Sequence, residues 1–134
     1  MKYWIPLLGL LLNSMTAQAA LNNISNQELQ QLLAQGVPII DVRRPEEWKQ
    51  TGVVEGSHLM TFFDKKGNYN VGKWLQELSS VAGQDEPFIL ICRTGNRTGI
   101  IGRFLANKLK FSRVYNVEKG ITHWISRGNP VVKQ

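Results

Sequence analysis

The chain has 134 residues and carries 16 Lys or Arg against 10 Asp or Glu, which gives a formal net charge of +6 at pH 7. Its single Cys excludes an internal disulfide bridge, and its two His lie far apart without neighbouring ligands at metal-binding spacing, so we expect no metal site and no cofactor. The positive charge does not indicate nucleic-acid binding, because no motif interleaves basic and aromatic residues.

Residues 1–19 have the pattern of a secretory signal peptide. Lys2 gives a positive start, residues 5–12 are apolar, and Ala17-Gln18-Ala19 is a small-residue cleavage site. The apolar stretch is well short of the roughly 20 residues that a membrane-spanning helix needs. We therefore expect cleavage before Ala20, a periplasmic or secreted location and no stable membrane association.

The remaining residues, 20–134, are enough for one domain with a single core and too few for two. We expect this domain to be a monomer. A lone thiol that is kept in an oxidising compartment favours a reactive role over a structural one.

The first part of this domain alternates between helix and strand signals. Ser25-Asn26-Gln27-Glu28 fits a helix capping box, and Gly36 is placed to end the helix that follows. Residues 37–42 form a β-branched apolar run that predicts a strand. Pro45 and the two glutamates after it indicate the entry to a second helix, in which Trp48 is expected to pack against the core.

The signals between residues 53 and 83 are weaker. Residues 53–60 bracket Gly56 and suggest a short edge strand with a bend at the glycine. Residues 63–70 are polar and turn-rich, which predicts a mobile loop that borders the site. Apolar residues then recur at helical spacing from Trp74 to Val81, and Gly83 is expected to end that helix.

The most informative stretch is Cys92-Arg93-Thr94-Gly95-Asn96-Arg97, which lies between a strand signal and a helix signal. Residues 87–91 are a continuous apolar run, typical of a buried parallel strand. The helix after the loop should bury one apolar face, made by Ile100, Ile101, Phe104, Leu105 and Leu109. Cys92 is thus expected at the carboxyl end of a strand, beneath N–H groups that the next helix leaves unpaired.

This arrangement predicts an anion cradle with a nucleophile at its base. A helix N-terminus and the cations of Arg93 and Arg97 both favour thiolate over thiol. Gly95 permits the backbone angles that turn successive N–H groups inward. The alternative is that Cys92 is a small buried hydrophobic residue, a common fate for a free cysteine.

Charge is divided unevenly along the chain. Residues 20–87 carry six Lys or Arg and nine Asp or Glu, whereas residues 88–134 carry nine Lys or Arg and one Glu, which gives −3 and +8. If the basic part surrounds the loop, it raises the local concentration of small anions.

The cysteine loop resembles the active-site loop of the rhodanese family, sulfurtransferases in which a short loop after the cysteine closes on an arginine. Other segments resemble this family as well, and together they extend over residues 25–132: Ile40-Asp41-Val42-Arg43, residues 45–48, 52–57, 114–121 and 128–131, and Trp124. Glu55 stands where proline is usual, and Lys119 stands where glycine is usual.

The resemblance implies an α/β fold, a doubly wound five-stranded parallel sheet with helices on both faces. It implies that Cys92 is catalytic and takes sulfane sulfur from a small anion such as thiosulfate as a persulfide, which a thiol or cyanide then collects. The loop residues would bind the substrate, and two further residues would support the loop. The substrate-binding residues are Arg93, Thr94, Gly95, Asn96 and Arg97; the supporting residues are Asp41 and Thr98.

Several alternatives remain open on the sequence. Asp41 could be an ordinary strand-end carboxylate, and Arg97 could anchor the loop by pairing with a carboxylate such as Asp41. The protein could be a persulfide-carrying or thiol-binding module with little turnover. It could also be a cysteine-dependent phosphatase, but related phosphatases place five residues between cysteine and arginine, and this chain has four.

Overall fold

The computed structural model describes residues 20–134. Residues 1–19, and with them the predicted signal peptide, lie outside the described residues. The described chain forms a five-stranded sheet in the order β1-β5-β4-β2-β3, in which every neighbouring pair is parallel. The strands are β1 (Asn22–Ile24), β2 (Ile39–Asp41), β3 (His58–Leu59), β4 (Phe88–Ile91) and β5 (Val114–Val117).

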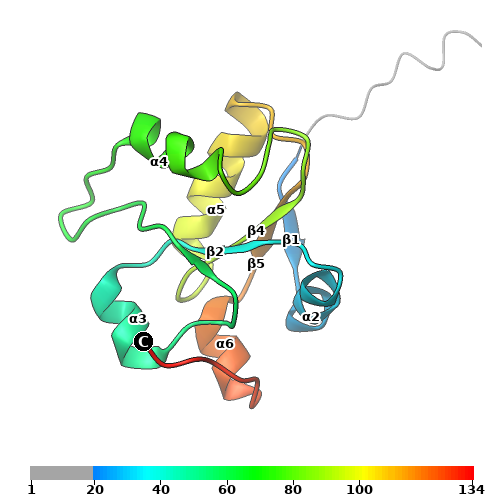
Figure 1. Ribbon diagram of the computed structural model, residues 1–134, viewed down its shortest axis with the longest axis vertical. Helices are drawn as coiled ribbons and strands as arrows, with labels where there is room; N and C mark the ends of the chain where they lie inside the picture. Colours follow the sequence, from blue (N-terminus) through cyan, green and yellow to red (C-terminus); the bar gives the residue numbers. More distant parts are fainter. Residues whose placement is uncertain (1–19) are drawn as a thin grey trace, which may run out of the picture.

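Helices cover both faces of the sheet, which confirms the doubly wound α/β fold (Figure 1). One face carries α4 (Val71–Leu78) and α5 (Asn96–Arg103), and α5 continues into the π-helical turn η1 (Phe104–Lys108). The other face carries α2 (Asn26–Ala34), α3 (Pro45–Thr51) and α6 (Gly120–Ser126). Among the described residues, no helix has the length and apolar character required to cross a membrane.

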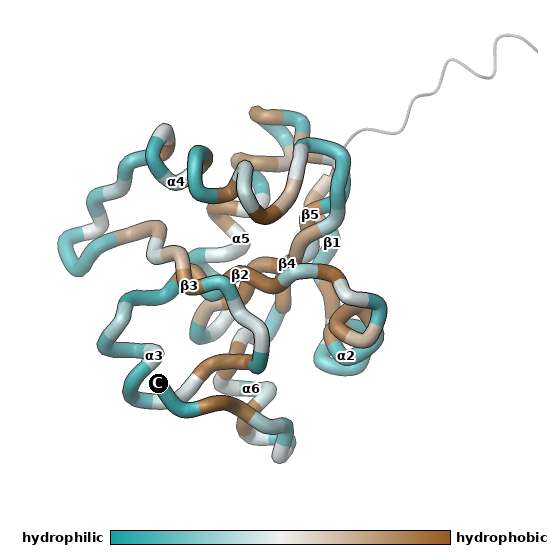
Figure 2. Tube along the Cα trace, viewed as in Figure 1, coloured by the Kyte–Doolittle hydropathy of each residue, from teal (hydrophilic) through white to brown (hydrophobic). Residues whose placement is uncertain are grey.

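Alternation of side chains along β4 divides the core into two clusters. Phe88 and Leu90 face α4 and α5, whereas Ile89 and Ile91 face α2 and α6, and all four are fully buried. This burial on both faces explains why the strand appears in the sequence as an unbroken apolar run. Figure 2 shows the result, with hydrophobic strands inside and mostly hydrophilic connections outside.

The chain order places a crevice between β2 and β4. After β2 the chain moves outward to β3, and after β4 it moves the opposite way to β5. Such a switch point leaves the carboxyl ends of the two central strands uncovered by their own connections. Asp41 is paired with Ile91 in the register, so the segments that follow both strands, α3 and the Cys92 loop, lie side by side.

Two details of the helices differ from the expectations. Ile100 is 54% exposed, because the buried side of α5 and η1 runs through Thr98, Ile101 and Leu105 instead. Helix α4 ends at Leu78, before Gly83, where the hydroxyls of Ser79 and Ser80 donate to backbone carbonyls and compete with the helical pattern. The capping box at Ser25 is confirmed, since its hydroxyl accepts from the Glu28 N–H and Glu28 accepts from the Ser25 N–H.

Candidate active site

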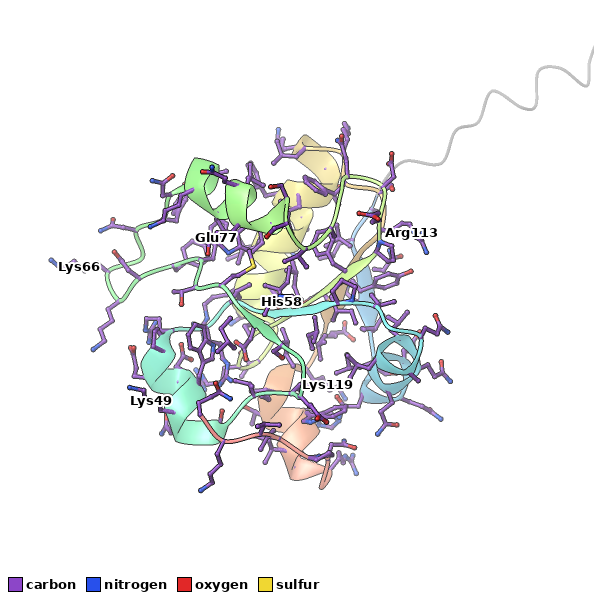
Figure 3. The ribbon with its side chains drawn as sticks, in the orientation of Figure 1. Lys49, His58, Lys66, Glu77, Arg113 and Lys119 are labelled. Atoms are coloured by element: carbon purple, nitrogen blue, oxygen red, sulfur yellow. The ribbon has the colours of Figure 1, made fainter. Side chains whose placement is uncertain are left out.

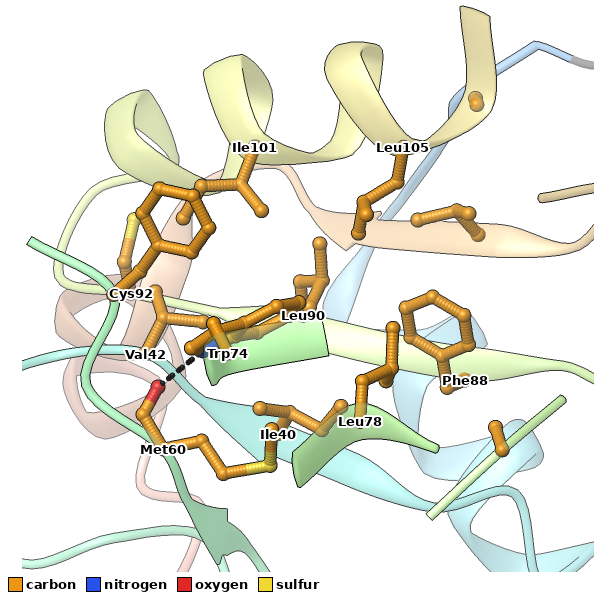
Figure 4. Packing of buried hydrophobic residues seen from close by; sticks show 14 residues of the cluster. Ile40, Val42, Met60, Trp74, Leu78, Phe88, Leu90, Cys92, Ile101 and Leu105 are labelled. Atoms are coloured by element: carbon orange, nitrogen blue, oxygen red, sulfur yellow. Dashed lines mark hydrogen bonds between the residues drawn. The ribbon is translucent and has the colours of Figure 1, made fainter. Parts of the chain in front are cut away.

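Cys92 directly follows β4, at the base of the loop that leads into α5. It is 1% exposed and belongs to the apolar cluster beneath α5, where Figure 4 shows it next to Val42 and below Ile101. Its Sγ accepts a hydrogen bond from the Gly95 N–H at 3.2 Å and lies 3.3 Å from the Thr98 hydroxyl. Unlike a purely apolar core residue, the thiol thus has two polar partners, one in its own loop and one in the helix that follows it.

Two glycines with left-handed backbone angles, one in the loop and one in the turn before α6, allow the loop to keep its shape. Gly95 has φ 96° and caps α5, and Gly120 has φ 69° at the start of α6. A Cβ on Gly95 would collide with the Glu118 carbonyl, and a Cβ on Gly120 would collide with the backbone of Arg93. The Cys92 carbonyl also accepts from the Ile121 N–H at 2.9 Å. The loop is therefore packed tightly against the turn between β5 and α6.

Arg97, in the first turn of α5, is held by Glu47 of α3. Arg97 Nη1 donates to Glu47 Oε1 at 2.8 Å and Arg97 Nη2 donates to Oε2 at 2.7 Å. Such a forked pair fixes the position and the orientation of the guanidinium. The hydrogen bonds from Arg97 lower the pKa of Glu47 from 4.5 to about 2, and the Glu47 carboxylate raises the pKa of Arg97. Arg97 therefore anchors the loop to α3.

Asp41 pairs with Arg43, and not with Arg97, the partner considered for it from the sequence. Its carboxylate pairs with Arg43, with a distance of 2.8 Å between Arg43 Nη2 and Asp41 Oδ2, and both side chains are fully buried. It also accepts from the Trp48 indole N–H at 3.1 Å. Within the described part of the chain, Asp41 makes no hydrogen bond to the cysteine loop. The carboxylate that contacts the loop is Glu47, because α3 carries it across the crevice from the end of β2.

The other predicted site residues differ in their exposure to solvent. Arg93, Thr94 and Asn96 are exposed, whereas Thr98 is fully buried and touches the cysteine. Exposure leaves the Arg93 cation accessible to a dissolved anion. Lys119 is also exposed, on the turn against which the loop packs (Figure 3). The substrate-binding roles expected for the exposed residues stay predictions.

Two polar residues of the site have no counterpart among the sequence predictions. Glu47 occupies the third position of α3, where it also accepts from the Arg44 N–H at 3.1 Å, and this capping pattern was the only local signal for it. Asn116 lies in β5, is 3% exposed and accepts a hydrogen bond from Thr98. Its signal was an amide in the middle of an otherwise apolar strand, Val114–Val117.

The fold and the site define a class of α/β protein, one with a cysteine loop at the carboxyl end of a central parallel strand. A family model, the rhodanese-like domain, matches residues 25–127. The chain therefore belongs to the rhodanese-like family.

Among curated proteins, the chain is 27% identical over 101 residues to the thiosulfate sulfurtransferase GlpE of Pseudomonas syringae. This match covers 75% of this chain and 84% of that protein. Among solved structures, it is similar to a rhodanese-related protein from Thermoplasma volcanium, with TM-score 0.64, 26% identity and coverage of 84% and 99% of the two chains. A Rhodopseudomonas palustris protein described as a possible tyrosine phosphatase has the same fold, with TM-score 0.61, 21% identity and coverage of 84% and 85%.

Proposed function

We propose that the protein is a sulfurtransferase that uses Cys92 to take a sulfane sulfur from thiosulfate and to pass it to a thiol or to cyanide. The observation that carries the proposal is a cysteine with hydrogen-bond partners at the start of a four-residue loop that closes on an anchored arginine. The thiosulfate sulfurtransferases among its relatives support this choice of reaction.

The proposed reaction consists of two transfers. The Cys92 thiolate attacks the outer sulfur of thiosulfate, so that a new S–S bond forms at Sγ while the original S–S bond breaks and sulfite leaves with its electron pair. The product is an anionic Cys92 persulfide. Cyanide or a thiolate then attacks the outer sulfur and returns Cys92 as a thiolate, with thiocyanate or a new persulfide as the second product. Two half-reactions of this kind give ping-pong kinetics.

Each part of the site has a task in this scheme. The Gly95 N–H, at 3.2 Å from Sγ, and the N-terminus of α5 favour negative charge at the sulfur. Arg97 holds the loop in place through its two hydrogen bonds to Glu47. Arg93, which is exposed, neutralises the incoming dianion. A four-residue loop closes more tightly than the five-residue loop of the related phosphatases, and this favours a sulfur atom over a phosphoryl group.

Cys92→Ser should abolish thiocyanate formation from thiosulfate and cyanide and leave the fold intact. Serine keeps the size and a hydrogen-bonding atom, but its hydroxyl is not ionised at neutral pH and cannot form a persulfide. Thiocyanate production, circular dichroism and the mass gain of 32 Da expected for a persulfide are measured on both proteins. A serine variant that works at the wild-type rate would sink the proposal.

The same preparations separate the alternatives. A persulfide-carrying module would gain the mass of one sulfur but release it slowly to cyanide. A phosphatase would hydrolyse a phenyl phosphate ester through Cys92 without using thiosulfate. Only fast thiocyanate formation together with the persulfide supports the enzyme.

We propose also that the protein is exported and works as a monomer beginning at Ala20. The pattern of residues 1–19, with Lys2, the apolar stretch and Ala17-Gln18-Ala19, supports this location. N-terminal sequencing of the protein expressed in a bacterial host should give Ala20, and a chain that still begins at Met1 would contradict the proposal. Light scattering on the same preparation measures the oligomeric state.

A further inference from the structure

A row of hydrogen bonds connects the cysteine to the edge of the sheet. Cys92 Sγ lies 3.3 Å from Thr98 Oγ1, which donates to Asn116 Oδ1 at 2.5 Å. Asn116 Nδ2 in turn donates to Asn23 Oδ1 at 3.0 Å. The row crosses from α5 to β5 and then to β1, where Asn23 and Asn116 are register partners.

The position of Asn116 is unusual for an amide. It is the register partner of Leu90, and it is buried on the side of the sheet that faces α5, next to the apolar Leu90 and Val114. Burying an amide there is unfavourable unless its polar atoms find partners. An apolar side chain at this position would need no hydrogen-bond partner. We therefore explain the amide by the group that it binds, the Thr98 hydroxyl.

The Thr98 hydroxyl has one proton and two oxygen acceptors, Asn116 Oδ1 at 2.5 Å and the Gly95 carbonyl at 3.4 Å, and the much shorter distance assigns the proton to Asn116. Asn116 presents its oxygen to Thr98, because its nitrogen is occupied with Asn23. The proton therefore points away from the sulfur, and a lone pair of Thr98 Oγ1 faces Cys92. In this arrangement the sulfur donates its S–H to Thr98 and accepts from the Gly95 N–H, so the neutral thiol is fully hydrogen-bonded.

A free thiolate at Cys92 loses this balance. The lone pair of Thr98 would then face an anion, and turning the hydroxyl toward the sulfur would leave the buried Asn116 oxygen without a donor. In a persulfide this conflict is smaller, because the negative charge lies on the outer sulfur and not on Sγ. The row thus opposes mainly the free thiolate, which is the form that oxidants attack.

We propose that Asn116 is a positioning residue that holds the Thr98 proton away from Cys92 and thereby disfavours the free thiolate. The inference rests on the proposed role of Cys92 as a nucleophile. Other groups act on the same sulfur: Arg93 and Arg97 beside it, Glu47 of α3 behind Arg97, the Asp41–Arg43 pair at the end of β2, and Glu118 on the neighbouring turn. None of them is changed when residue 116 is replaced.

The test is the rate at which iodoacetamide alkylates Cys92 at pH 7, followed by mass spectrometry. Iodoacetamide is neutral, and its reaction needs only the thiolate, which forms the C–S bond as iodide leaves. Asn116→Leu frees the Thr98 hydroxyl to donate to the sulfur, so alkylation should become faster by about three- to tenfold, the value of one hydrogen bond. Asn116→Val removes the same amide with a residue that suits a strand, and it is expected to act in the same direction.

A double-mutant comparison shows whether Asn116 acts through Thr98. In a Thr98→Val background, Asn116→Leu should change the alkylation rate by less than about twofold, and in a Thr98→Ser background the acceleration should return. Asn22→Leu is a control. Asn22 lies on β1 beside Asn23, the last residue of the row, but it is outside the row and donates to the Val114 carbonyl at 3.3 Å. This substitution should leave the rate unchanged.

Circular dichroism and urea unfolding of each variant confirm that folded proteins are compared. An alkylation rate at or below the wild-type rate in both Asn116 variants would overturn the proposal, and so would an acceleration that persists with valine at position 98. Alkylation does not require sulfur transfer. A protein that fails the thiocyanate assay but shows the Thr98-dependent acceleration would therefore contradict the proposed function and leave this inference standing.

Discussion

Two arginine–carboxylate pairs lie next to each other at the carboxyl end of the sheet, and they differ in almost every respect. Asp41 and Arg43 are both fully buried, and the Arg43 guanidinium also donates to the Thr51 hydroxyl at 2.9 Å and to the Gly52 carbonyl at 3.0 Å. Glu47 and Arg97 are 12% and 22% exposed, and they bind each other across the crevice.

The difference separates what maintains the fold from what holds the loop. Arg43 joins the end of β2 to the C-terminal end of α3, through Thr51 and Gly52, so its pair closes a local structure. Arg97 joins α3 to the cysteine loop, so its pair connects two parts of the chain that are fifty residues apart. We expect damage to the first pair to destabilise the whole domain, and damage to the second to loosen the site.

Arg43→Met should have the largest effect on stability. The variant leaves the Asp41 carboxylate buried without a counterion, and breaking a buried pair in this way costs about 3–5 kcal/mol. Urea unfolding followed by circular dichroism measures the loss. Arg44→Met is the matched control, because the neighbouring Arg44 pairs with Glu46 at the surface, and its loss should be below about 1 kcal/mol.

The cost should come from the uncompensated charge more than from the missing contacts. Asp41→Asn combined with Arg43→Met removes both charges, and this double variant should be more stable than Arg43→Met alone. Strictly additive losses would show that the packing of Arg43, and not its charge, carries the effect.

Glu47→Gln should have a smaller effect on stability and a larger one on the site. The lowered pKa of Glu47 corresponds to at most about 3 kcal/mol, and the partial exposure of both side chains reduces this to about 1–2 kcal/mol. Glutamine can still accept from the Arg44 N–H, so α3 keeps its first turn. Because Arg97 loses its counterion and one of its two hydrogen bonds, the loop is held less firmly, and alkylation of Cys92 and sulfur transfer should both fall, by roughly the same factor of about ten.

The pH dependence of the same variant checks the cause. The pKa of Glu47 is about 2 in the folded protein against an ordinary 4.5, so its contribution to stability is complete above about pH 4.5 and declines as the pH falls toward 2. The difference in unfolding free energy between wild type and Glu47→Gln should shrink over that window. Glu46→Gln, one residue away in an exposed pair with Arg44, should show a much smaller difference at every pH.

The parts of this structure that could be predicted from the sequence are those with local causes. The unbroken apolar run before Cys92 identified the central strand, because burial on both faces leaves no polar position. The capping box at Ser25 and the glycine of the loop mark backbone requirements that few other residues satisfy. Cys92 was found in the same way, as a thiol between a strand and a helix.

The parts that were missed depend on contacts between distant segments. Nothing near Glu47 indicates that α3 lies against the cysteine loop, since this follows from the positions of β2 and β4 in the sheet. Asp41 was the more conspicuous carboxylate, but its own neighbour Arg43 turns back and occupies it. Likewise, Asn116 meets Thr98 only because β5 lies between β1 and β4.

The smallest predicted effect concerns Arg93, the arginine of the cysteine loop that belongs to neither pair. Within residues 20–134, the exposed Arg93 side chain has no ion pair or hydrogen bond. Its charge is therefore available to an anionic donor, whereas that of Arg97 is already neutralised by Glu47. Arg93→Gln should lower kcat/KM for thiosulfate by about three- to tenfold, leave alkylation by iodoacetamide within about twofold, and leave the unfolding free energy unchanged.

Salt sharpens this last comparison. The attraction between Arg93 and a dianion is screened in about 0.5 M sodium chloride, so high salt should lower kcat/KM of the wild-type protein more than that of Arg93→Gln. Arg103→Gln removes a charge of the same sign from an exposed position at the other end of α5, and it should have little effect on either rate. If Arg93→Gln slowed thiosulfate use and alkylation equally, Arg93 would be supporting the loop as Arg97 does. Unequal losses, with thiosulfate affected alone, assign the free arginine to the substrate and the paired arginine to the loop.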